Sequence, residues 1–170
     1  MKFNDHISHF DNKYTTSGIE CYVKTEEQKL VIEVHPSKSI FPLFVTRLKY
    51  QKSDGFHKGY LKSFNAIKAQ FDVDFHYKIS QYNDIQITGF SIGGAISQIF
   101  ALYLYNEFNI KSTVITYDSP TPFNTKRRNE FDAAVLHQEH YVFGIDIFGD
   151  FPLKLFGYEF PKNQKDYKFV

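Results

Sequence analysis

The sequence predicts an α/β fold, with a mainly parallel sheet covered by helices on both faces. Short β-prone segments alternate with longer segments in which apolar residues recur at helical spacing, which is typical of this class. The 170 residues suit one domain with a sizeable core, and no repeat or Gly/Ser/Pro-rich linker divides them. We expect residues 1–20 to form an N-terminal arm or short helix and residues 21–170 to form the domain.

The first elements follow from two β-prone runs and two helical patterns. CYV and LVIEV, separated by the polar TEEQK within residues 21–34, predict a hairpin that leads into a buried strand. Apolar residues at helical spacing over 40–50 favour a helix that starts near Pro42. A second helical face runs through residues 57–71.

The second half of the chain continues the alternation. A β run over residues 84–90 precedes a long apolar helix that starts at residue 92. We expect a strand at 113–117, a helix at 130–138, a strand at 140–146 and a last edge strand at 165–170.

Composition excludes several classes of function. Because the formal net charge is only +1, the chain offers no field that would attract nucleic acid, so we expect no nucleic-acid partner. The single Cys21 excludes an internal disulfide, and no histidine pair with a nearby carboxylate shows a ligand spacing, so we expect neither metal nor cofactor. Without a signal-peptide pattern or an apolar run of roughly 20 residues, we expect a soluble, intracellular protein with no integral membrane segment; a protein partner or homo-oligomer stays open.

The strongest chemical signal is the GxSxG pattern Gly89-Phe90-Ser91-Ile92-Gly93, placed between the strand DIQITGF and the apolar helix. A serine on such a sharp strand-to-helix turn is exposed above the sheet, and the helix directs its first amides toward developing negative charge. The alternative is that the glycines only permit close packing of helix and sheet. A phosphate loop is excluded because GFSIGGA lacks the GK[ST] ending.

ITGFSIGGAISQIFALYL resembles the GHSLGGA elbow of the class 3 (fungal triacylglycerol) lipase family, with Phe90 in place of a histidine. Four further segments resemble family motifs in the same order: LVIEVHPSKSI, GFHKGYLKSFNAI, VITYDSPTPFNTKRRNEF and YVFGIDIFGDFPLKLFGYEF. The resemblance covers about residues 21–170 and is strongest at the elbow. It implies a small, C-terminally shortened α/β-hydrolase-like three-layer sandwich and a serine esterase or lipase acting on acyl esters of lipids.

Residue by residue, the resemblance implies that Ser91 is the nucleophile and Asp146 the triad aspartate. It also implies that Ser37 offers its hydroxyl and amide to the oxyanion, together with the amide of Ile92. On the residues alone, Asp146 fits as a carboxylate just after a predicted strand, although a loop cap is the commoner role.

Alternatives to these two assignments stay open. Asp118 and Asp150 compete with Asp146, and Ser37 also fits a turn residue in a polar loop.

Two departures from the family pattern concern the base and the oxyanion loop. His35-Pro36 replaces the family's Arg-Gly, and no histidine follows Asp146 in this chain. His57, which matches a family histidine at a helix start near the site, is our candidate base, and His35 is the second; a local cap or packing role is the alternative for each. We expect His140 at the opposite end of the sheet, and His6, His9, His76 and His137 have no assigned place.

A substrate pocket is predicted from apolar residues near the elbow. Phe41 and Phe44, with Ile40 and Leu43, follow the oxyanion loop and fit a lid or acyl-chain pocket together with Phe90, or else ordinary helix packing. Two functions therefore stand: a serine hydrolase of lipid or small acyl esters, and a catalytically inactive lipase-like domain, a pseudoenzyme, that binds lipid or protein or serves structurally in an assembly.

Overall fold

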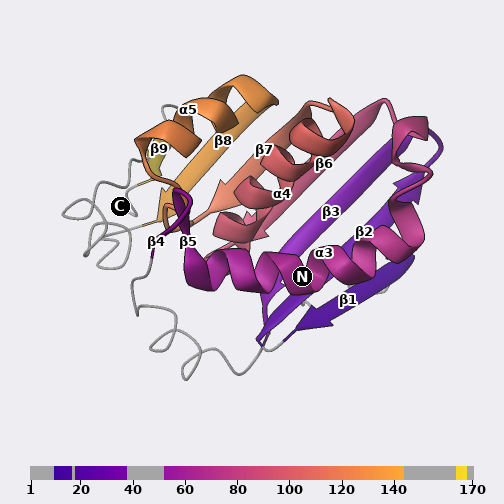
Figure 1. Cartoon of the computed structure of the whole chain (residues 1–170), viewed down its shortest axis with the longest axis horizontal. Coiled ribbons are helices and arrows are strands. Elements are labelled where there is room, and N and C mark those ends of the chain that lie inside the picture. Colours follow the sequence, from indigo (N-terminus) through magenta and orange to yellow (C-terminus); the bar gives the residue numbers. More distant parts are fainter. Residues whose placement is uncertain (1–9, 17, 38–51, 144–163, 168–170) are drawn as a thin grey trace.

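The computed structural model describes residues 10–16, 18–37, 52–143 and 164–167. These residues form a seven-stranded sheet in the order β1-β2-β3-β6-β7-β8-β9 and a two-stranded ribbon of β4 and β5 (Figure 1). Strands β3, β6, β7, β8 and β9 are parallel, whereas β1 and β2 pair antiparallel at one edge. The predicted α/β fold with a mostly parallel sheet is confirmed.

The strands of the large sheet are β1 Asn12–Thr16, β2 Ile19–Glu26, β3 Lys29–Pro36, β6 Asp84–Phe90, β7 Ser112–Tyr117, β8 Val135–Phe143 and β9 Gln164–Tyr167. The ribbon consists of β4 Lys52–Ser53 and β5 Phe56–His57. The helices are α3 Lys58–Phe75, the short 3-10 helix η1 Ile79–Gln81, α4 Ile92–Phe108 and α5 Thr125–Ala134.

The described α-helices lie on one face of the sheet, with α4 between α3 and α5 (Figure 1). This arrangement follows from the alternation along the strands, because every second residue of β3, namely Leu30, Ile32 and Val34, is fully buried against that face. Helix α4 has neighbours on several sides, which explains why its residues are apolar almost all round. Within the described residues, the predicted helices cover one face of the sheet, and helices on the other face stay a prediction.

Several predicted elements are confirmed with small changes of boundary. The hairpin is β2–β3, the helix over 57–71 is α3, and the strands over 84–90 and 113–117 are β6 and β7. The final edge strand is β9, which pairs with β8. The helix expected over 40–50 and the end of the strand expected over 140–146 lie outside the described residues.

The N-terminal arm or short helix expected over residues 1–20 is wrong for Asn12–Thr16, which form the edge strand β1. Only Tyr14 of this strand is buried, and its hydroxyl donates a 2.7 Å hydrogen bond to Asp74 on α3. Because an edge strand with one buried side chain shows almost no apolar alternation, the sequence pattern could not reveal it.

The helix expected over 130–138 is displaced. Helix α5 begins after Asn124, whose side chain accepts a hydrogen bond from the Arg127 amide, and Val135 already has extended backbone and pairs with Ser112 of β7. Phe131 and Val135 are four residues apart and both buried, which mimics a helical face. Phe131 packs into the core from helix α5, whereas Val135 packs into the same core from strand β8.

Candidate active site

Ser91 occupies a strained turn between β6 and α4. Its backbone has φ 52° and ψ −127°, a region that residues with a Cβ rarely adopt and that costs about 1–3 kcal/mol. The surrounding chain holds this conformation: the Ser91 amide donates to the carbonyl of Tyr117 at 2.8 Å, and the Gly94 amide donates to the carbonyl of Ser91 at 2.8 Å. The serine predicted from the GxSxG pattern therefore has the backbone geometry of a nucleophile elbow.

The glycines around Ser91 are required by close contacts. A Cβ at Gly89 would stand 2.5 Å from the carbonyl oxygen of Gly93, and a Cβ at Gly93 would stand 2.1 Å from the carbonyl oxygen of Val34. Both obstructing atoms belong to the backbone, so no side-chain movement could relieve the clash. Close packing of helix and sheet thus explains these glycines, but it does not explain the positive φ of Ser91.

Ile92 is the first residue of α4, a helix of 17 residues. The unpaired amides of a first helical turn and the helix dipole favour negative charge at this end. The Gly94 amide is not one of the unpaired amides, because it donates to the Ser91 carbonyl. The role of the Ile92 amide in an oxyanion hole stays a prediction.

Ser37 lies just beyond the end of β3, and β3 runs beside β6 with Val34 opposite Gly89. This register brings Ser37 to the sheet edge that carries the elbow. Its backbone amide, however, donates a 2.9 Å hydrogen bond to the carbonyl of Gly18, so this amide is not available to an oxyanion. That the Ser37 hydroxyl donates to the oxyanion stays a prediction.

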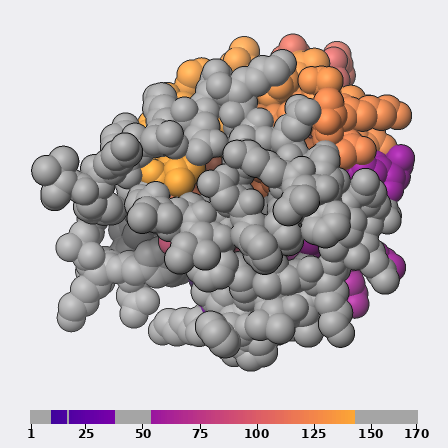
Figure 2. All heavy atoms as spheres, turned by 90° about the vertical axis from the view of Figure 1, so that its left-hand side faces the viewer, coloured from indigo at the N-terminus to yellow at the C-terminus, as the bar shows by residue number. Residues whose placement is uncertain are grey.

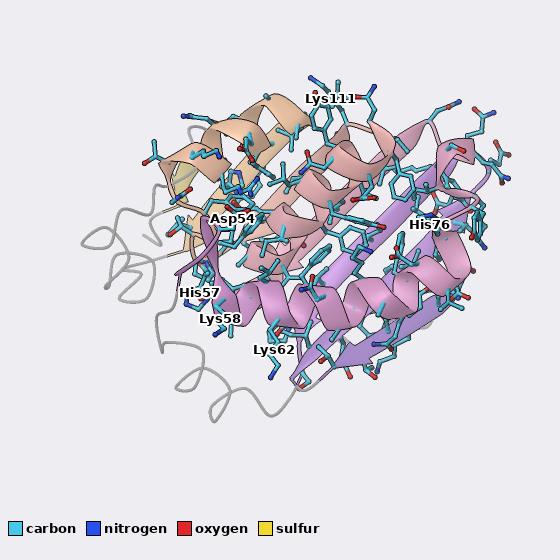
Figure 3. The ribbon with its side chains drawn as sticks, in the orientation of Figure 1. Asp54, His57, Lys58, Lys62, His76 and Lys111 are labelled. Atoms are coloured by element: carbon cyan, nitrogen blue, oxygen red, sulfur yellow. The ribbon has the colours of Figure 1, made fainter. Side chains whose placement is uncertain are left out.

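His57 ends β5 and immediately precedes α3 (Figure 3). It is 2 % exposed, and its ring stacks on Tyr60 with 4.1 Å between the centroids. Its side chain makes no capping hydrogen bond to α3, which disfavours the local-cap alternative. Its amide donates to the carbonyl of Pro122 at 2.9 Å.

The loop over residues 118–124 joins His57 to the elbow side of the sheet. This loop follows β7, whose last residue Tyr117 accepts the Ser91 amide, and it also bonds to the chain around His57 through Pro122 and Asn124. Figure 2 faces the side of the molecule on which the parallel strands end, and in this view α5 and the start of α3 lie on the same side. His57 and Ser91 therefore border one loop, and the approach of the imidazole to the serine hydroxyl stays a prediction.

The prediction for His140 is wrong, because this residue lies within β8, level with Thr116 and Gly89 and close to the edge that carries Ser91. It is 3 % exposed, with Nδ1 2.6 Å from the Thr116 hydroxyl and Nε2 2.9 Å from Gln138 Oε1. Burial, with the nearby Arg128 cation, lowers the pKa of His140 to about 3. A neutral ring whose two nitrogens are both engaged is poorly suited to act as the base.

His35, the second candidate base, lies on the sheet face opposite the described helices, because its neighbour Val34 points into the core. Its Nε2 is 3.1 Å from Glu33 Oε2, and its ring contacts Tyr22 edge-on. His76 lies at the other end of α3 from His57 (Figure 3).

Other predicted site residues have different outcomes. Asp146, Phe41, Phe44 and the competitor Asp150 lie outside the described residues. Phe90 is 44 % exposed and pairs with Tyr117 across the strands, so an aromatic side chain is accessible next to Ser91. Asp118 follows β7 at the elbow edge, where its amide donates to the Tyr141 carbonyl at 2.8 Å.

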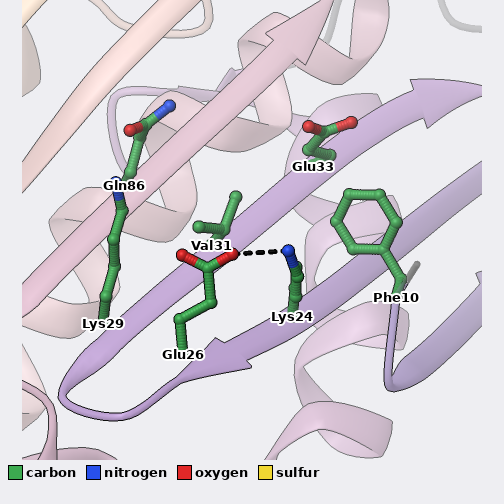
Figure 4. Close-up of a pocket in the computed structure, with 7 residues that line it drawn as sticks. All are labelled: Phe10, Lys24, Glu26, Lys29, Val31, Glu33 and Gln86. Carbon is green, nitrogen blue, oxygen red and sulfur yellow. Dashed lines mark ion pairs between the residues drawn. The ribbon is translucent and has the colours of Figure 1, made fainter. Parts of the chain in front are cut away.

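The described pocket lies elsewhere, on the outer side of β2, β3 and β6 near the β2–β3 turn (Figure 4). It is lined by Phe10, Lys24, Glu26, Lys29, Val31, Glu33 and Gln86. Gln86 precedes Ser91 by five residues of extended chain, a separation of roughly 17 Å. This pocket is therefore not the acyl pocket predicted beside the elbow.

Within the described residues there is neither a metal-ligand group nor a membrane-spanning helix. No group of three or more His, Cys, Asp or Glu side chains is arranged to hold a metal ion within this part of the chain. None of the helices in the described ranges combines the length and the apolar character needed to span a bilayer.

The fold matches solved lipases over nearly the whole chain. The lipase from Rhizopus microsporus var. chinensis aligns with a TM-score of 0.76 at 18 % identity, covering 95 % of this chain and 63 % of that protein. The native Rhizomucor miehei lipase propeptide complex gives 0.77 at 20 % identity, with coverages of 94 % and 56 %, and lipase II from Rhizopus niveus gives 0.78 at 15 %, with 96 % and 68 %.

The chain thus spans less than two thirds of the first two of these structures and 68 % of the third. No curated protein matches the sequence. The model of the family described as "Lipase (class 3)" matches residues 26–155, which is most of the chain and includes the elbow. Together with the α/β-hydrolase fold, this match shows that the chain belongs to the class 3 lipase family.

Proposed function

We propose that this protein is a serine hydrolase of lipid acyl esters in which Ser91 is the nucleophile. The observation that carries the proposal is the positive φ of Ser91, 52°, on a turn between a parallel strand and a buried helix. Binding alone gives no reason to keep a non-glycine residue in this strained conformation. Acyl transfer gives such a reason, because the turn presents the serine hydroxyl above the sheet next to the amides of a helix N-terminus.

The chemistry would proceed in two steps. The Ser91 oxygen attacks the ester carbonyl carbon while a base takes the hydroxyl proton, and the amide of Ile92 with the Ser37 hydroxyl stabilises the oxyanion. The tetrahedral intermediate collapses, the alcohol leaves with the proton from the base, and an acyl-enzyme remains. Water, deprotonated by the same base, then releases the fatty acid and restores the serine.

His57 is our proposed base, oriented by Asp146. The support for His57 is its burial, 2 % exposed, and its hydrogen-bonded attachment to the loop that also borders Ser91. Competing histidines are less suited: His140 has a lowered pKa and two engaged nitrogens, and His35 lies on the outer sheet face beside Glu33.

Lipid esters are the proposed substrates because the similar structures are lipases, one of them named a triacylglyceride lipase. The half-exposed ring of Phe90 next to the nucleophile provides apolar surface for an acyl chain. Phe41 and Phe44 would extend that surface.

The second candidate function is a catalytically inactive lipase-like domain that binds lipid or protein or serves structurally in an assembly. It is favoured by the chain before the expected oxyanion residue: Pro36 has no amide to offer, and the Ser37 amide already donates to the Gly18 carbonyl at 2.9 Å. With fewer donors for the oxyanion, acyl transfer at Ser91 would be slow.

Fluorophosphonate labelling and hydrolysis of a short-chain p-nitrophenyl ester distinguish the two functions. We expect wild type to be labelled and active, and both signals to disappear in Ser91→Ala and to fall about 10³-fold in His57→Ala. His76→Ala, a change at the far end of α3, is the matched histidine control and should behave as wild type. Wild type as inert as Ser91→Ala would reject the hydrolase proposal in favour of the inactive domain.

A further inference from the structure

A buried group of polar side chains lies between α4, α5 and β8, outside the residues assigned to catalysis. We call it the Arg128 cluster: Arg128, Asp132, Gln98, Gln138, His140 and Thr116. Arg128 is 1 % exposed and donates to Asp132 Oδ1 at 3.0 Å, to Gln98 Oε1 at 2.9 Å and to Gln138 Oε1 at 2.6 Å. A cation so deeply buried is tolerated only when its donors are satisfied, so these positions are tightly specified.

The hydrogen bonds within the cluster have only one consistent direction. Gln98 must turn its oxygen to Arg128, so its amide nitrogen faces Ser119 Oγ, 2.9 Å away. The Ser119 hydroxyl therefore accepts from Gln98 and donates to the Pro120 carbonyl at 3.0 Å. A chain of hydrogen bonds thus runs from the Arg128 guanidinium through Gln98 to Ser119, in the turn that follows β7.

On the other side of Arg128, the same reasoning determines which ring nitrogen of His140 carries the hydrogen. Gln138 Oε1 already accepts from Arg128, so His140 Nε2 must carry the hydrogen that points to this oxygen. Nδ1 then accepts from the Thr116 hydroxyl. The neutral tautomer required here agrees with the lowered pKa of His140.

The cluster and Ser119 meet the elbow helix at Gly94, whose carbonyl also accepts a long 3.5 Å hydrogen bond from the Gln98 amide nitrogen. A Cβ added to Gly94 would stand 2.6 Å from the Cβ of Ser119, so the Ser119 side chain packs directly on the first turn of α4. Beyond Ser119 the same loop supplies the Pro122 carbonyl that accepts the His57 amide. Movement of Ser119 would therefore change the placement of the elbow and of His57 together.

We infer that Gln98 is a positioning residue that acts through Ser119 to hold the loop over residues 118–124 against the elbow, with Arg128 orienting Gln98. This inference rests on the proposed hydrolase function. Gln98 is 1 % exposed and its amide group faces Arg128 and Ser119, so we place it outside the reacting groups and assign its effect to the geometry of Ser91 and His57. Asp118-Ser119-Pro120 lies within a segment that resembles a lipase motif, but nothing in the sequence links this segment to Gln98, which is 21 residues away from Ser119.

The decisive variant is Gln98→Glu, which is nearly isosteric. The introduced carboxylate still accepts from Arg128, but it cannot donate to Ser119, whose hydroxyl must reverse and lose its bond to Pro120. Ser119→Ala removes the same link from the other side, without a buried charge. We expect the rate of fluorophosphonate labelling of Ser91 to fall about tenfold in each, and kcat for the p-nitrophenyl ester to fall with KM nearly unchanged.

The matched control is Gln70→Glu on α3. The Gln70 amide nitrogen also donates across elements, to the Thr15 carbonyl at 2.9 Å, but it has no link to the elbow. We expect this variant to be labelled at the wild-type rate. If Gln98 acts through Ser119, the double variant Gln98→Glu/Ser119→Ala is no slower than either single variant. Wild-type labelling in both single variants, or additive losses in the double variant, would overturn the inference.

Hydrogen exchange separates this inference from the proposed function. If wild type is not labelled at all, the hydrolase proposal fails, and amide exchange over residues 84–100 then decides the positioning role alone. Faster exchange at Ser91 and Gly94 in Gln98→Glu than in Gln70→Glu would support it. Equal protection in the two variants would reject it.

Discussion

The Cα of Gly93 lies so close to the carbonyl oxygen of Val34 that an added Cβ would stand 2.1 Å from it. This contact joins the first turn of α4 to β3, the strand on one side of β6. Because the obstructing oxygen belongs to a strand in the middle of the sheet, it cannot rotate away as a side chain would.

Gly93→Ala is therefore expected to destabilise the fold by about 1–3 kcal/mol or more, although alanine favours helices elsewhere. The free energy of unfolding from urea titration measures this loss. Gly59→Ala in the first turn of α3 is the control, and we expect it to be neutral or stabilising. A Gly93→Ala protein as stable as wild type would show that α4 does not approach β3 this closely.

Replacing Arg128 should cost far more than replacing its neighbour Arg127. Arg128→Ala leaves the Asp132 carboxylate, 13 % exposed, without its paired cation, and we expect a loss of about 3–5 kcal/mol in unfolding free energy. Arg127 pairs with Asp54, whose side chain is 80 % exposed, so we expect Arg127→Ala to lower the unfolding free energy by less than about 1 kcal/mol. Equal losses in urea titrations of the two variants would contradict the burial of the Arg128 cluster.

The lowered pKa of His140 predicts a loss of stability in acid. In the folded state its pKa is about 3, below the ordinary value of 6.5, so the unfolded chain binds a proton that the folded chain does not. The stabilisation is complete above about pH 6.5 and declines as the pH falls toward 3, by up to about 1.4 kcal/mol per pH unit for this one group. Unfolding free energies measured from pH 7 to pH 4 test the slope.

His140→Gln removes that titration, so its stability should depend less on pH than that of wild type over the same range. His137→Gln on the outer side of β8, where the side chain is 58 % exposed, is the control and should keep the wild-type slope. Identical slopes for wild type and His140→Gln would show that His140 does not cause the pH dependence.

The hydrogen bond from Tyr14 to Asp74 ties β1 to α3. Burial and the neighbouring carboxylate raise the pKa of Tyr14, so the phenol is a hydrogen-bond donor at every physiological pH. Tyr14→Phe should lower the unfolding free energy by about 1–2 kcal/mol, since a bond to a charged acceptor is lost. Tyr77→Phe, at a residue 94 % exposed, should have no measurable effect in the same titration.

The sequence alone determined the local features of this protein. The GxSxG pattern between a β run and an apolar helix predicted the elbow, because a tight turn at a helix start has few sequence solutions. Hairpin β2–β3, helix α3 and strands β6 and β7 were predictable as well, since each carries its own apolar period. The resemblance to class 3 lipases rested on the same short segments.

Tertiary structure decided what no local period encodes. Strand β1 is held by pairing at a sheet edge, Val135 leaves the helical pattern to pair with Ser112, and His140 lies at the elbow end of the sheet and not at the far end. The Arg128 cluster gathers residues from α4, α5 and two strands, and the Ser37 amide is engaged by the Gly18 carbonyl. These arrangements depend on which segments meet in the fold, and contacts between distant residues leave no periodic trace along a single chain.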